Sequence, residues 1–289
     1  MKYNKAILLS GGQGTRLRPI TNLINKHLLP VHDKPMIFYS LSIIMLSKIR
    51  DICIVSDLDT INILKKFFGN GEWLGIKLEY IEQKKSLGIA NGISISKNFI
   101  KNSNFLLMLG DGLFFGSDLT TYLRKAQTEK SDAKIFSYEV KNPSFFGVLS
   151  SNKKNYKIIE KPKKFIGNKI ITGMYFLPNY SMEIAKKTKI SKRGEMEITD
   201  LLNEILKKRN CKIYDFKRGI KWLDMGTLEN LTIASNLIKN IEHNNAQKIA
   251  CLEEIALNNG WIKNIDYKFF KNKYGNTEYF NYLKKLKTF

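Results

Sequence analysis

Apolar runs rich in β-branched residues alternate with segments of helical periodicity between residues 5 and 109 of this chain. The alternation predicts strands at 5–10, 51–56, 77–82 and 104–109, with helices between them at about 35–48, 59–67 and 87–97. Strands separated by helices assemble into a parallel sheet through right-handed crossovers. We therefore expect an α/β fold with a Rossmann-like, mostly parallel sheet flanked by helices, and ligands at the carboxyl ends of its strands.

The pattern changes after residue 132. Shorter apolar runs follow, separated by turns rich in Asn, Pro, Ser and Lys: AKIFSYEV, FGVLS, YKIIEKP and ITGMYFLP. They predict inserted, antiparallel strands that wall a second pocket. Further predicted elements are helices at about 179–187, 196–208 and 227–241 and strands at 211–216 and 220–224. Residues 245–289 carry short helical and aromatic stretches without strands, which predicts a C-terminal helical element.

The 289-residue chain is 43% hydrophobic, enough to bury a substantial core. Its longest apolar run, 36–46, is shorter than the roughly 20 residues that cross a bilayer. Residues 1–10 lack the apolar length and the cleavage site of a signal peptide. We therefore expect a globular protein of the cytoplasm without a membrane-spanning helix.

The chain contains three cysteines and three histidines. The cysteines, Cys53, Cys211 and Cys251, are too far apart for a CxxC motif, so we expect reduced, structural thiols. The histidines fit no zinc spacing, and each is predicted to be a surface or loop residue instead of a metal ligand. They are His27, His32 and His243.

The formal net charge of +22 suggests polyanionic partners, such as nucleic acid, an anionic membrane or phosphorylated substrates. The lysines are scattered through nearly every segment and form no single stripe interleaved with aromatic residues. We therefore interpret the charge as a solvated surface, and we expect neither nucleic acid nor a membrane as a partner.

A GGQG sequence directly follows the first predicted strand. Gly11, Gly12 and Gly14 remove side chains where backbone N–H groups can approach phosphate oxygens. Arg16 and Lys26 follow, and their charges can offset the negative charge that moves onto a leaving pyrophosphate. Neither GxGxxG nor the Walker pattern fits this spacing. The segment predicts a triphosphate site, and a tight turn without a ligand is the alternative for the glycines alone.

Two aspartates end predicted strands that are far apart in the sequence. Asp111 follows the apolar run 105–109, and Asp224 lies within KWLDMGT. Either residue alone fits a turn or a helix cap. Together they suit Mg²⁺, which commonly uses one or two carboxylates and fills its other positions with phosphate oxygens and water.

Two further runs carry charges beside predicted elements. Glu160-Lys161-Pro162 ends a strand, where a lysine restricted by the following proline can contact a sugar phosphate and the carboxylate can contact hydroxyls. RGEMEITD at 193–200 opens a predicted helix, so the helix macrodipole explains its acidic residues. Arg193 is not explained in that way.

Several runs occur together in an order typical of one family: GGQGTRL, KHLLP, DKPMI, EKP, RGEMEITD, WLDMGT and CLEEIA. Over essentially its whole length the chain resembles the sugar-1-phosphate nucleotidylyltransferases, and within that family the enzymes that use dTTP and glucose 1-phosphate. The resemblance implies magnesium-dependent attack of a sugar 1-phosphate oxygen on the α-phosphorus of dTTP, in line with departing pyrophosphate. It implies a dTDP-sugar as the product and no covalent enzyme intermediate.

The same resemblance implies roles for individual residues. The implied catalytic residues are Arg16, Lys26, Asp111 and Asp224, and the two aspartates would bind Mg²⁺. The implied nucleotide-binding residues are Leu9, Gly11, Gly12, Gly14, Thr15, Arg16, Gln83, Gly88 and Asp111. The implied sugar-phosphate-binding residues are Gly147, Glu160, Lys161, Thr172 and Arg193.

The resemblance also implies a division of the chain. A catalytic domain is expected at 1–240, with a nucleotide-binding part at about 1–130 and a sugar-phosphate-binding part at about 131–226. The helical element at 241–289 is expected to make subunit contacts in a homotetramer, with a dimer as the alternative, and to contribute to a regulatory nucleotide site.

Four positions depart from the usual family pattern. His27 and Asn91 stand where glutamines are usual, Gly112 replaces an asparagine, and Met225 replaces a threonine. Lost hydrogen bonds near the base or ribose can change nucleotide choice, so UTP or CTP, or another sugar 1-phosphate, is the first alternative. The second is a non-catalytic nucleotide-sensing or assembly subunit whose positive surface binds nucleic acid. Retention of all four implied catalytic residues argues against it.

Overall fold

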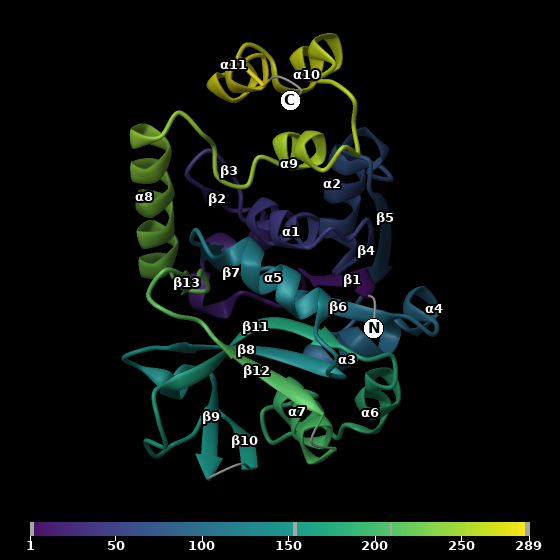
Figure 1. Cartoon of the computed structure of the whole chain (residues 1–289), viewed down its shortest axis with the longest axis vertical. Coiled ribbons are helices and arrows are strands. Elements are labelled where there is room, and N and C mark those ends of the chain that lie inside the picture. The colour runs from purple at the N-terminus through teal and green to yellow at the C-terminus, as the bar shows by residue number, and fades with distance from the viewer. Residues whose placement is uncertain (1–2, 153–154, 209, 287–289) are drawn as a thin grey trace.

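The computed structural model describes residues 3–152, 155–208 and 210–286, which contain a central sheet of nine strands (Figure 1). Seven strands follow one another in the order β10-β9-β11-β6-β1-β4-β5, and β8 and β12 extend the sheet from β11. The strands are β1 (Tyr3–Leu9), β4 (Asp51–Ser56), β5 (Lys77–Glu82), β6 (Asn104–Leu109), β8 (Ala133–Glu139), β9 (Gly147–Asn152), β10 (Asn155–Glu160), β11 (Lys169–Leu177) and β12 (Cys211–Asp215). The predicted α/β class is confirmed.

The first half of the sheet is parallel, because β1 pairs in parallel with β4 and β6, and β4 with β5. Alternate residues of β1 enter two different cores. Ala6 and Leu8 pack with α1 (Met36–Leu46) and α2 (Leu58–Phe68), whereas Ile7 packs with α3 (Ile89–Ile95). Burial on both faces explains why these strands are continuous apolar runs, and the predicted positions of the first four strands are confirmed to within about two residues.

The second half is antiparallel, as predicted for the inserted strands. β11 pairs antiparallel with β6, β8 and β9, and β10 pairs antiparallel with β9. β12 is the exception, because it runs parallel to β8. The helices α6 (Ser181–Lys187) and α7 (Ile198–Lys207) share one core with these strands, in which Leu201 and Leu202 are fully buried.

Two elements between residues 112 and 128 were not predicted from the sequence. β7 (Gly112–Phe115) pairs with β13 (Lys221–Asp224) in a separate two-stranded sheet, and α5 (Leu119–Thr128) follows it. β7 is a short strand whose partner lies far along the chain, so local periodicity does not reveal it. The apolar face of α5 consists of Leu119, Leu123 and Ala126, which is a weak signal in a polar helix.

The helix predicted at about 35–48 does not include Pro35 in its first turn, because α1 begins at Met36. Pro35 ends β3 (Lys34–Pro35), which forms a short hairpin with β2 (Pro30–Val31), and α1 begins at the next residue. Pro35 is the N-cap residue and has an extended backbone. It therefore lies one position before the first helical residue, where proline is most common.

The helix predicted at 87–97 is divided into two. α3 ends at Ile95, and α4 (Lys97–Ile100) begins after Ser96. The Ser96 hydroxyl donates to the Gly92 carbonyl oxygen at 2.8 Å, a side-chain bond that competes with the regular helix ladder.

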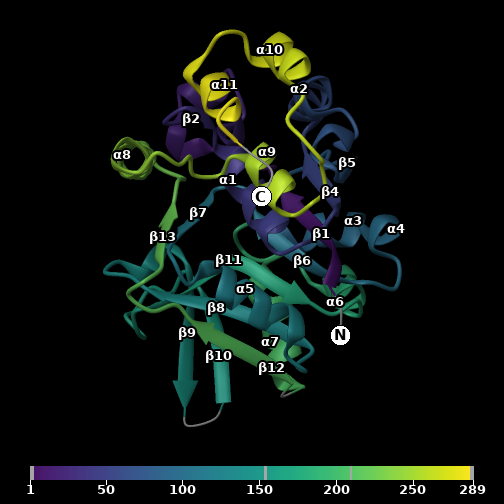
Figure 2. The ribbon, with the colours of Figure 1, turned by 45° about the horizontal axis from the view of Figure 1, so that its top comes forward.

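The C-terminal part is helical, as predicted, and consists of α8 (Leu228–Asn244), α9 (Leu252–Asn258), α10 (Tyr267–Tyr274) and α11 (Glu278–Leu283). α9 packs on α1, and α10 and α11 lie at the end of the molecule away from β9 and β10 (Figures 1 and 2). The buried Glu253 carboxylate of α9 accepts hydrogen bonds from the Tyr274 and Tyr279 hydroxyls, which ties the three helices together. Residues 287–289 of the expected tail lie outside the described residues.

Within the described ranges, no helix combines the length and the apolar character needed to cross a bilayer. The three cysteines are free, and Cys53 and Cys251 are buried, which agrees with the structural role predicted for them. Burial also raises the pKa of the Cys53 thiol to about 12, so this group is held protonated and unreactive.

Candidate active site

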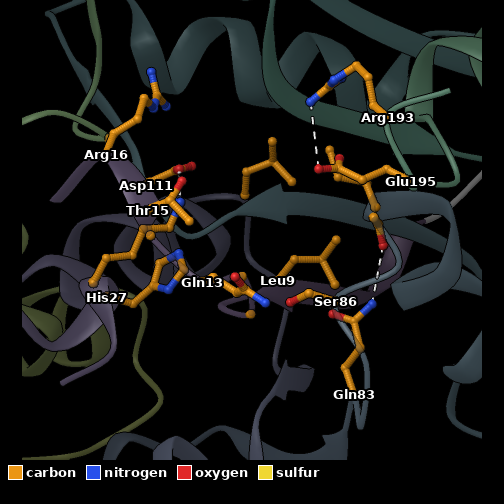
Figure 3. Close-up of a pocket in the computed structure, with 18 of the residues that line it drawn as sticks. Leu9, Gln13, Thr15, Arg16, His27, Gln83, Ser86, Asp111, Arg193 and Glu195 are labelled. Carbon is orange, nitrogen blue, oxygen red and sulfur yellow. Dashed lines mark hydrogen bonds and ion pairs between the residues drawn. The ribbon is translucent and has the colours of Figure 1, made fainter. Parts of the chain in front are cut away.

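A cavity of about 540 Å³ opens at the carboxyl ends of β1, β5 and β6 (Figure 3). Leu9 ends β1, the glycine turn follows it, Gln83 follows β5, and Asp111 comes two residues after β6. All nine residues expected to bind the nucleotide line this cavity, together with Lys26. The cavity is also lined by residues that were not predicted from the sequence to belong to a site: Gln13, His27, Ser86, Ile89, Leu109, Gly194, Glu195 and Gly226.

The glycine turn has the backbone conformation that its sequence suggests. Gly12 has φ 107° and Gly14 has φ 57°, values that residues with a Cβ rarely adopt. A Cβ on Gly14 would also lie 2.9 Å from the Cγ2 of Thr21. The turn therefore requires glycine at Gly14 for two independent reasons.

Two ion pairs stand at one side of the cavity. The Lys26 ammonium binds the Asp111 carboxylate, and the Arg16 guanidinium lies 3.4 Å from the Asp224 carboxylate. A Cβ on Gly226 would lie 2.4 Å from Arg16 Nη2, so the glycine after Met225 leaves room for the guanidinium. The Arg16 side chain is 51% exposed, which leaves it free to reach a bound anion.

Pairing of β7 with β13 brings Asp111 and Asp224 together. Asp224 lies opposite Gly112 in the ladder, and the Met225 N–H donates to the Asp111 carbonyl oxygen at 2.9 Å. Burial raises the pKa of Asp224, and the negative charge of Asp111 raises it further. Burial alone would also raise the pKa of Asp111, but the Lys26 ammonium outweighs it and holds this pKa below its usual value.

Asp111 and Asp224 are two carboxylates that repel each other beside the glycine turn. Such a pair suits a divalent cation. Both offer oxygen ligands of the kind that Mg²⁺ prefers. In this structure the positive charge comes from Lys26, which pairs with Asp111, and from Arg16, which pairs with Asp224. The residues present therefore fit the implied metal.

A second, smaller cavity of about 140 Å³ continues from the first, and the two share Arg16, Ile89, Leu109 and Asp111. This is the second pocket expected beside the inserted strands. Of the residues expected to bind the sugar phosphate, Gly147, Glu160 and Thr172 line this cavity, whereas Lys161 and Arg193 line the larger one. Its other lining residues are Gly112, Phe145, Phe146, Ile171, Gly173, Tyr175, Ile198, Trp222 and Asp224. The aromatic members carry no local signal of a site, because aromatic residues on strands usually belong to the core.

The Arg193 guanidinium is surrounded by three carboxylates. It lies 3.1 Å from Glu160, 3.2 Å from Glu197 and 3.6 Å from Glu195. The macrodipole interpretation fits Asp200, in the first turn of α7, and Glu197, the N-cap residue, whereas Glu195 lies two residues before the cap. Glu195 and Glu197 also form ion pairs with Arg193, and for Glu195 these are the explanation that the structure offers.

His27 differs from the surface or loop residue that we predicted, because its side chain is buried, with the residue 1% exposed, although it lies in a short turn. Its Nδ1 lies 2.8 Å from the Oδ1 of Asn25. Burial and the Lys26 charge lower the pKa of His27 to about 3, so the ring is neutral. Figure 3 shows it below Asp111 on the cavity wall.

A separate cluster of possible metal ligands, His32, Asp33 and Glu242, lies away from both cavities. Its carboxylates already contact two ammonium groups, since Glu242 lies 3.2 Å from Lys34 and 2.9 Å from Lys248. The cluster is therefore an ion-pair network that joins the β2–β3 hairpin to α8, and its charge is balanced without a metal.

This chain belongs to the nucleotidyl transferase family, whose model matches residues 5–241. Glucose-1-phosphate thymidylyltransferase from Neisseria meningitidis is 39% identical over 285 residues, which cover 98% of this chain and 99% of that protein. The protein of the same name from Mycolicibacterium smegmatis is 36% identical over 260 residues, which cover 89% of this chain and 90% of the relative. The family resemblance is therefore confirmed.

Two solved structures of other proteins have a similar fold. A Bacillus anthracis protein assigned as a glucose-1-phosphate thymidylyltransferase, crystallised with a sucrose, has a TM-score of 0.76 and 33% identity, covering 85% of this chain and 98% of its own. A UDP-glucose pyrophosphorylase in complex with UDP-glucose has a TM-score of 0.73 and 28% identity, covering 83% of this chain and 100% of its own. The fold is that of sugar nucleotidyltransferases.

Proposed function

We propose that this protein transfers the thymidylyl group of dTTP to α-D-glucose 1-phosphate, giving dTDP-glucose and pyrophosphate. The supporting observation is that two cavities of different size meet at Arg16 and Asp111. The larger one has room for a nucleotide beside the glycine turn, and the smaller one suits a single sugar ring. A reaction that joins two substrates needs both in contact with the same charged groups.

The proposed chemistry depends on positioning and charge. A sugar 1-phosphate is already anionic near neutral pH, so its oxygen attacks without a general base. The backbone of the glycine turn, with Arg16 and Lys26, would hold the triphosphate and stabilise the charge of the departing pyrophosphate. Lys161 and Arg193 would hold the phosphate of the attacking sugar.

Asp111 and Asp224 are the proposed ligands of Mg²⁺. The ion would act as a Lewis acid on phosphate oxygens and neutralise charge that develops during transfer. With Asp111 and Asp224 holding the metal, Lys26 and Arg16, which now pair with these carboxylates, would be available to contact the phosphates.

UTP is the second candidate nucleotide, because one structural neighbour is a UDP-glucose pyrophosphorylase. We further propose a homotetramer in the cytoplasm, in which residues 241–289 contribute to subunit contacts and to a regulatory nucleotide site. α9 is suited to relay such contacts, because it packs directly on α1, the helix that follows the Lys26 turn and the β2–β3 hairpin.

The test is a substrate screen with the purified full chain and Mg²⁺. Pyrophosphate release is measured for dTTP, UTP, CTP, ATP and GTP with glucose 1-phosphate, and then for dTTP with other sugar 1-phosphates. The proposal expects the highest kcat/KM for dTTP with glucose 1-phosphate. A much higher kcat/KM for another pair would assign that pair as the substrates. The absence of pyrophosphate release with every pair would reject the transferase activity.

A further inference from the structure

The carboxamide of Gln83 lies on the cavity wall away from Arg16 and Asp111 (Figure 3). Its Nε2 donates to the Gly88 carbonyl oxygen at 3.2 Å and to the Asn91 Oδ1 at 2.9 Å. A primary amide nitrogen carries two hydrogens, so both are in use. The Gln83 side chain therefore has no N–H left to offer a ligand.

The orientation of this amide follows from its partners. A backbone carbonyl accepts and never donates, so the Gln83 atom that faces Gly88 must be nitrogen. The other atom is then Oε1, which has no hydrogen-bond partner among the described residues. It lies near the glycine turn, since a Cβ on Gly11 would be 2.9 Å away. Gln83 thus presents a hydrogen-bond acceptor to the cavity.

The two groups that hold the amide are themselves held by the backbone. Gly88 and Asn91 belong to the start of α3, where the Ala90 N–H donates to the Met196 carbonyl at 3.1 Å. The Met196 N–H in turn donates to the Leu87 carbonyl at 2.7 Å. A Cβ on Gly88 would lie 2.8 Å from the Met196 carbonyl oxygen, so the backbone at Gly88 also packs closely against Met196. The acceptor is preorganised before any ligand arrives.

Such an acceptor distinguishes nucleobases by their hydrogen-bonding edges. Thymine and uracil carry an N3–H donor, whereas cytosine presents an unprotonated N3 acceptor at the same place. Two acceptors that face each other lose a hydrogen bond and leave both groups desolvated and unpaired. A fixed Gln83 Oε1 therefore favours an imide base and disfavours cytosine.

We infer that Asn91 is a positioning residue that determines nucleotide choice through Gln83. The Gly88 carbonyl and Asn91 together hold the amide nitrogen, and the contact with Asn91 is the shorter of the two. Without Asn91 the longer contact with Gly88 is left alone, so the amide rotates more readily and can offer a donor to cytosine. This inference rests on the proposed function, because it requires the base of the nucleotide to lie at the Gln83 end of the larger cavity.

The test compares kcat/KM for dTTP and dCTP, with glucose 1-phosphate and Mg²⁺, in three forms of the full chain. Asn91→Leu removes the acceptor. The ratio of kcat/KM for dTTP to that for dCTP should then fall by about fivefold or more, which corresponds to the loss of one hydrogen bond of about 1 kcal/mol. In Asn91→Asp, which keeps an acceptor oxygen, the preference should stay within about twofold of the unaltered chain. Asn91→Ala serves as a second removal if Asn91→Leu does not fold.

The same preference is measured without catalysis, by calorimetric titration of dTTP and dCTP into each form. Unchanged preference in Asn91→Leu and Asn91→Ala would overturn the inference, and so would an equal loss in Asn91→Asp. Equal binding of both nucleotides by the unaltered chain would also overturn it. If the unaltered chain binds dTTP in preference to dCTP, Asn91→Leu loses that preference and no form releases pyrophosphate, the proposed activity fails and the role of Asn91 stands.

Discussion

The two halves of the candidate active site are built in different ways. On the nucleotide side, the glycine turn, Arg16 and Lys26 lie within one short stretch of sequence after β1, and they meet Asp111 after the neighbouring β6. On the sugar side, the lining comes from β9, β10, β11, α7 and β13, which are spread over much of the chain. The nucleotide side therefore depends on local backbone geometry, and the sugar side depends on how distant strands pair.

This difference predicts which changes damage which substrate. Substitutions on the nucleotide side should impair phosphate handling, whatever sugar is offered. Substitutions on the sugar side should change the KM for the sugar 1-phosphate and leave the handling of dTTP largely intact. Asp111 belongs to neither side alone, because it lines both cavities. Asp224 lines the smaller cavity, and the pairing of β7 with β13 brings it beside Asp111.

The largest effect is expected from Asp111→Asn and Asp224→Asn. Each change removes a negative charge from the proposed metal site, so kcat should fall by about 10²–10³, comparable to the loss of a main electrostatic contact. Pyrophosphate release measures the effect, and thermal unfolding checks that the fold is intact. The exposed Asp59 provides a matched control, since Asp59→Asn should keep full activity. Full activity in both site variants would contradict the metal assignment.

A smaller effect separates the two sides. Lys26→Ala should raise the KM for dTTP, because Lys26 lines the larger cavity and not the smaller one. Glu160→Ala should raise the KM for glucose 1-phosphate, because Glu160 lines the smaller cavity and not the larger one. Each constant should rise by about tenfold to hundredfold for lost charged hydrogen bonds. Steady-state kinetics with one substrate varied at a time measures both constants. Arg18→Ala is the control, because Arg18 is exposed and does not line either cavity. If each variant weakened both substrates equally, the division into two sides would be wrong.

The glycines offer a comparison of stability. Gly194 has φ 80° with nothing within 4 Å of an added Cβ, whereas Gly14 has φ 57° and a clash with Thr21. Gly194→Ala should therefore lower the free energy of unfolding by about 1–2 kcal/mol, the cost of a left-handed alanine. Gly14→Ala should cost more, because Thr21 must also move. Urea unfolding measures both values, and an equal or smaller loss for Gly14→Ala would argue against the tight turn.

The smallest effect concerns Asp57, whose carboxylate caps α2 and accepts a hydrogen bond from Asn25. Burial alone would raise the pKa of Asp57, but hydrogen bonds from Thr60 and Asn25 hold this pKa below its usual value. Because the folded-state pKa is depressed, the ionised group stabilises the fold above the unfolded value and loses this effect as the pH falls through the folded value.

Asp57→Asn keeps an oxygen for the cap but removes the charge. The difference in urea midpoint between the unaltered chain and this variant should be constant above about pH 5 and shrink as the pH falls towards about 2. A difference that stays the same over that range would show that the charge of Asp57 contributes nothing.

Much of the nucleotide side could be predicted from the sequence, because local patterns carry it. The buried strands are continuous apolar runs, and Gly14 and Arg16 follow the first one directly. The sugar side was harder. Arg193 was left without an explanation because its partners Glu160 and Glu197 come from β10 and from the segment before α7. β7 was missed because its partner β13 lies far away in sequence.

By itself, the sequence determined the order of most strands and helices, the glycine turn after the first strand and the family. These features depend on periodicity and on residue types at neighbouring positions, which a linear pattern records directly. The tertiary structure alone decided which side chains face each other. Examples are the neutral, buried His27, the three carboxylates around Arg193, and the Gln83 amide that donates to Gly88 and Asn91. Such contacts join residues from different elements, and their hydrogen-bond direction and burial exist only once the chain has folded.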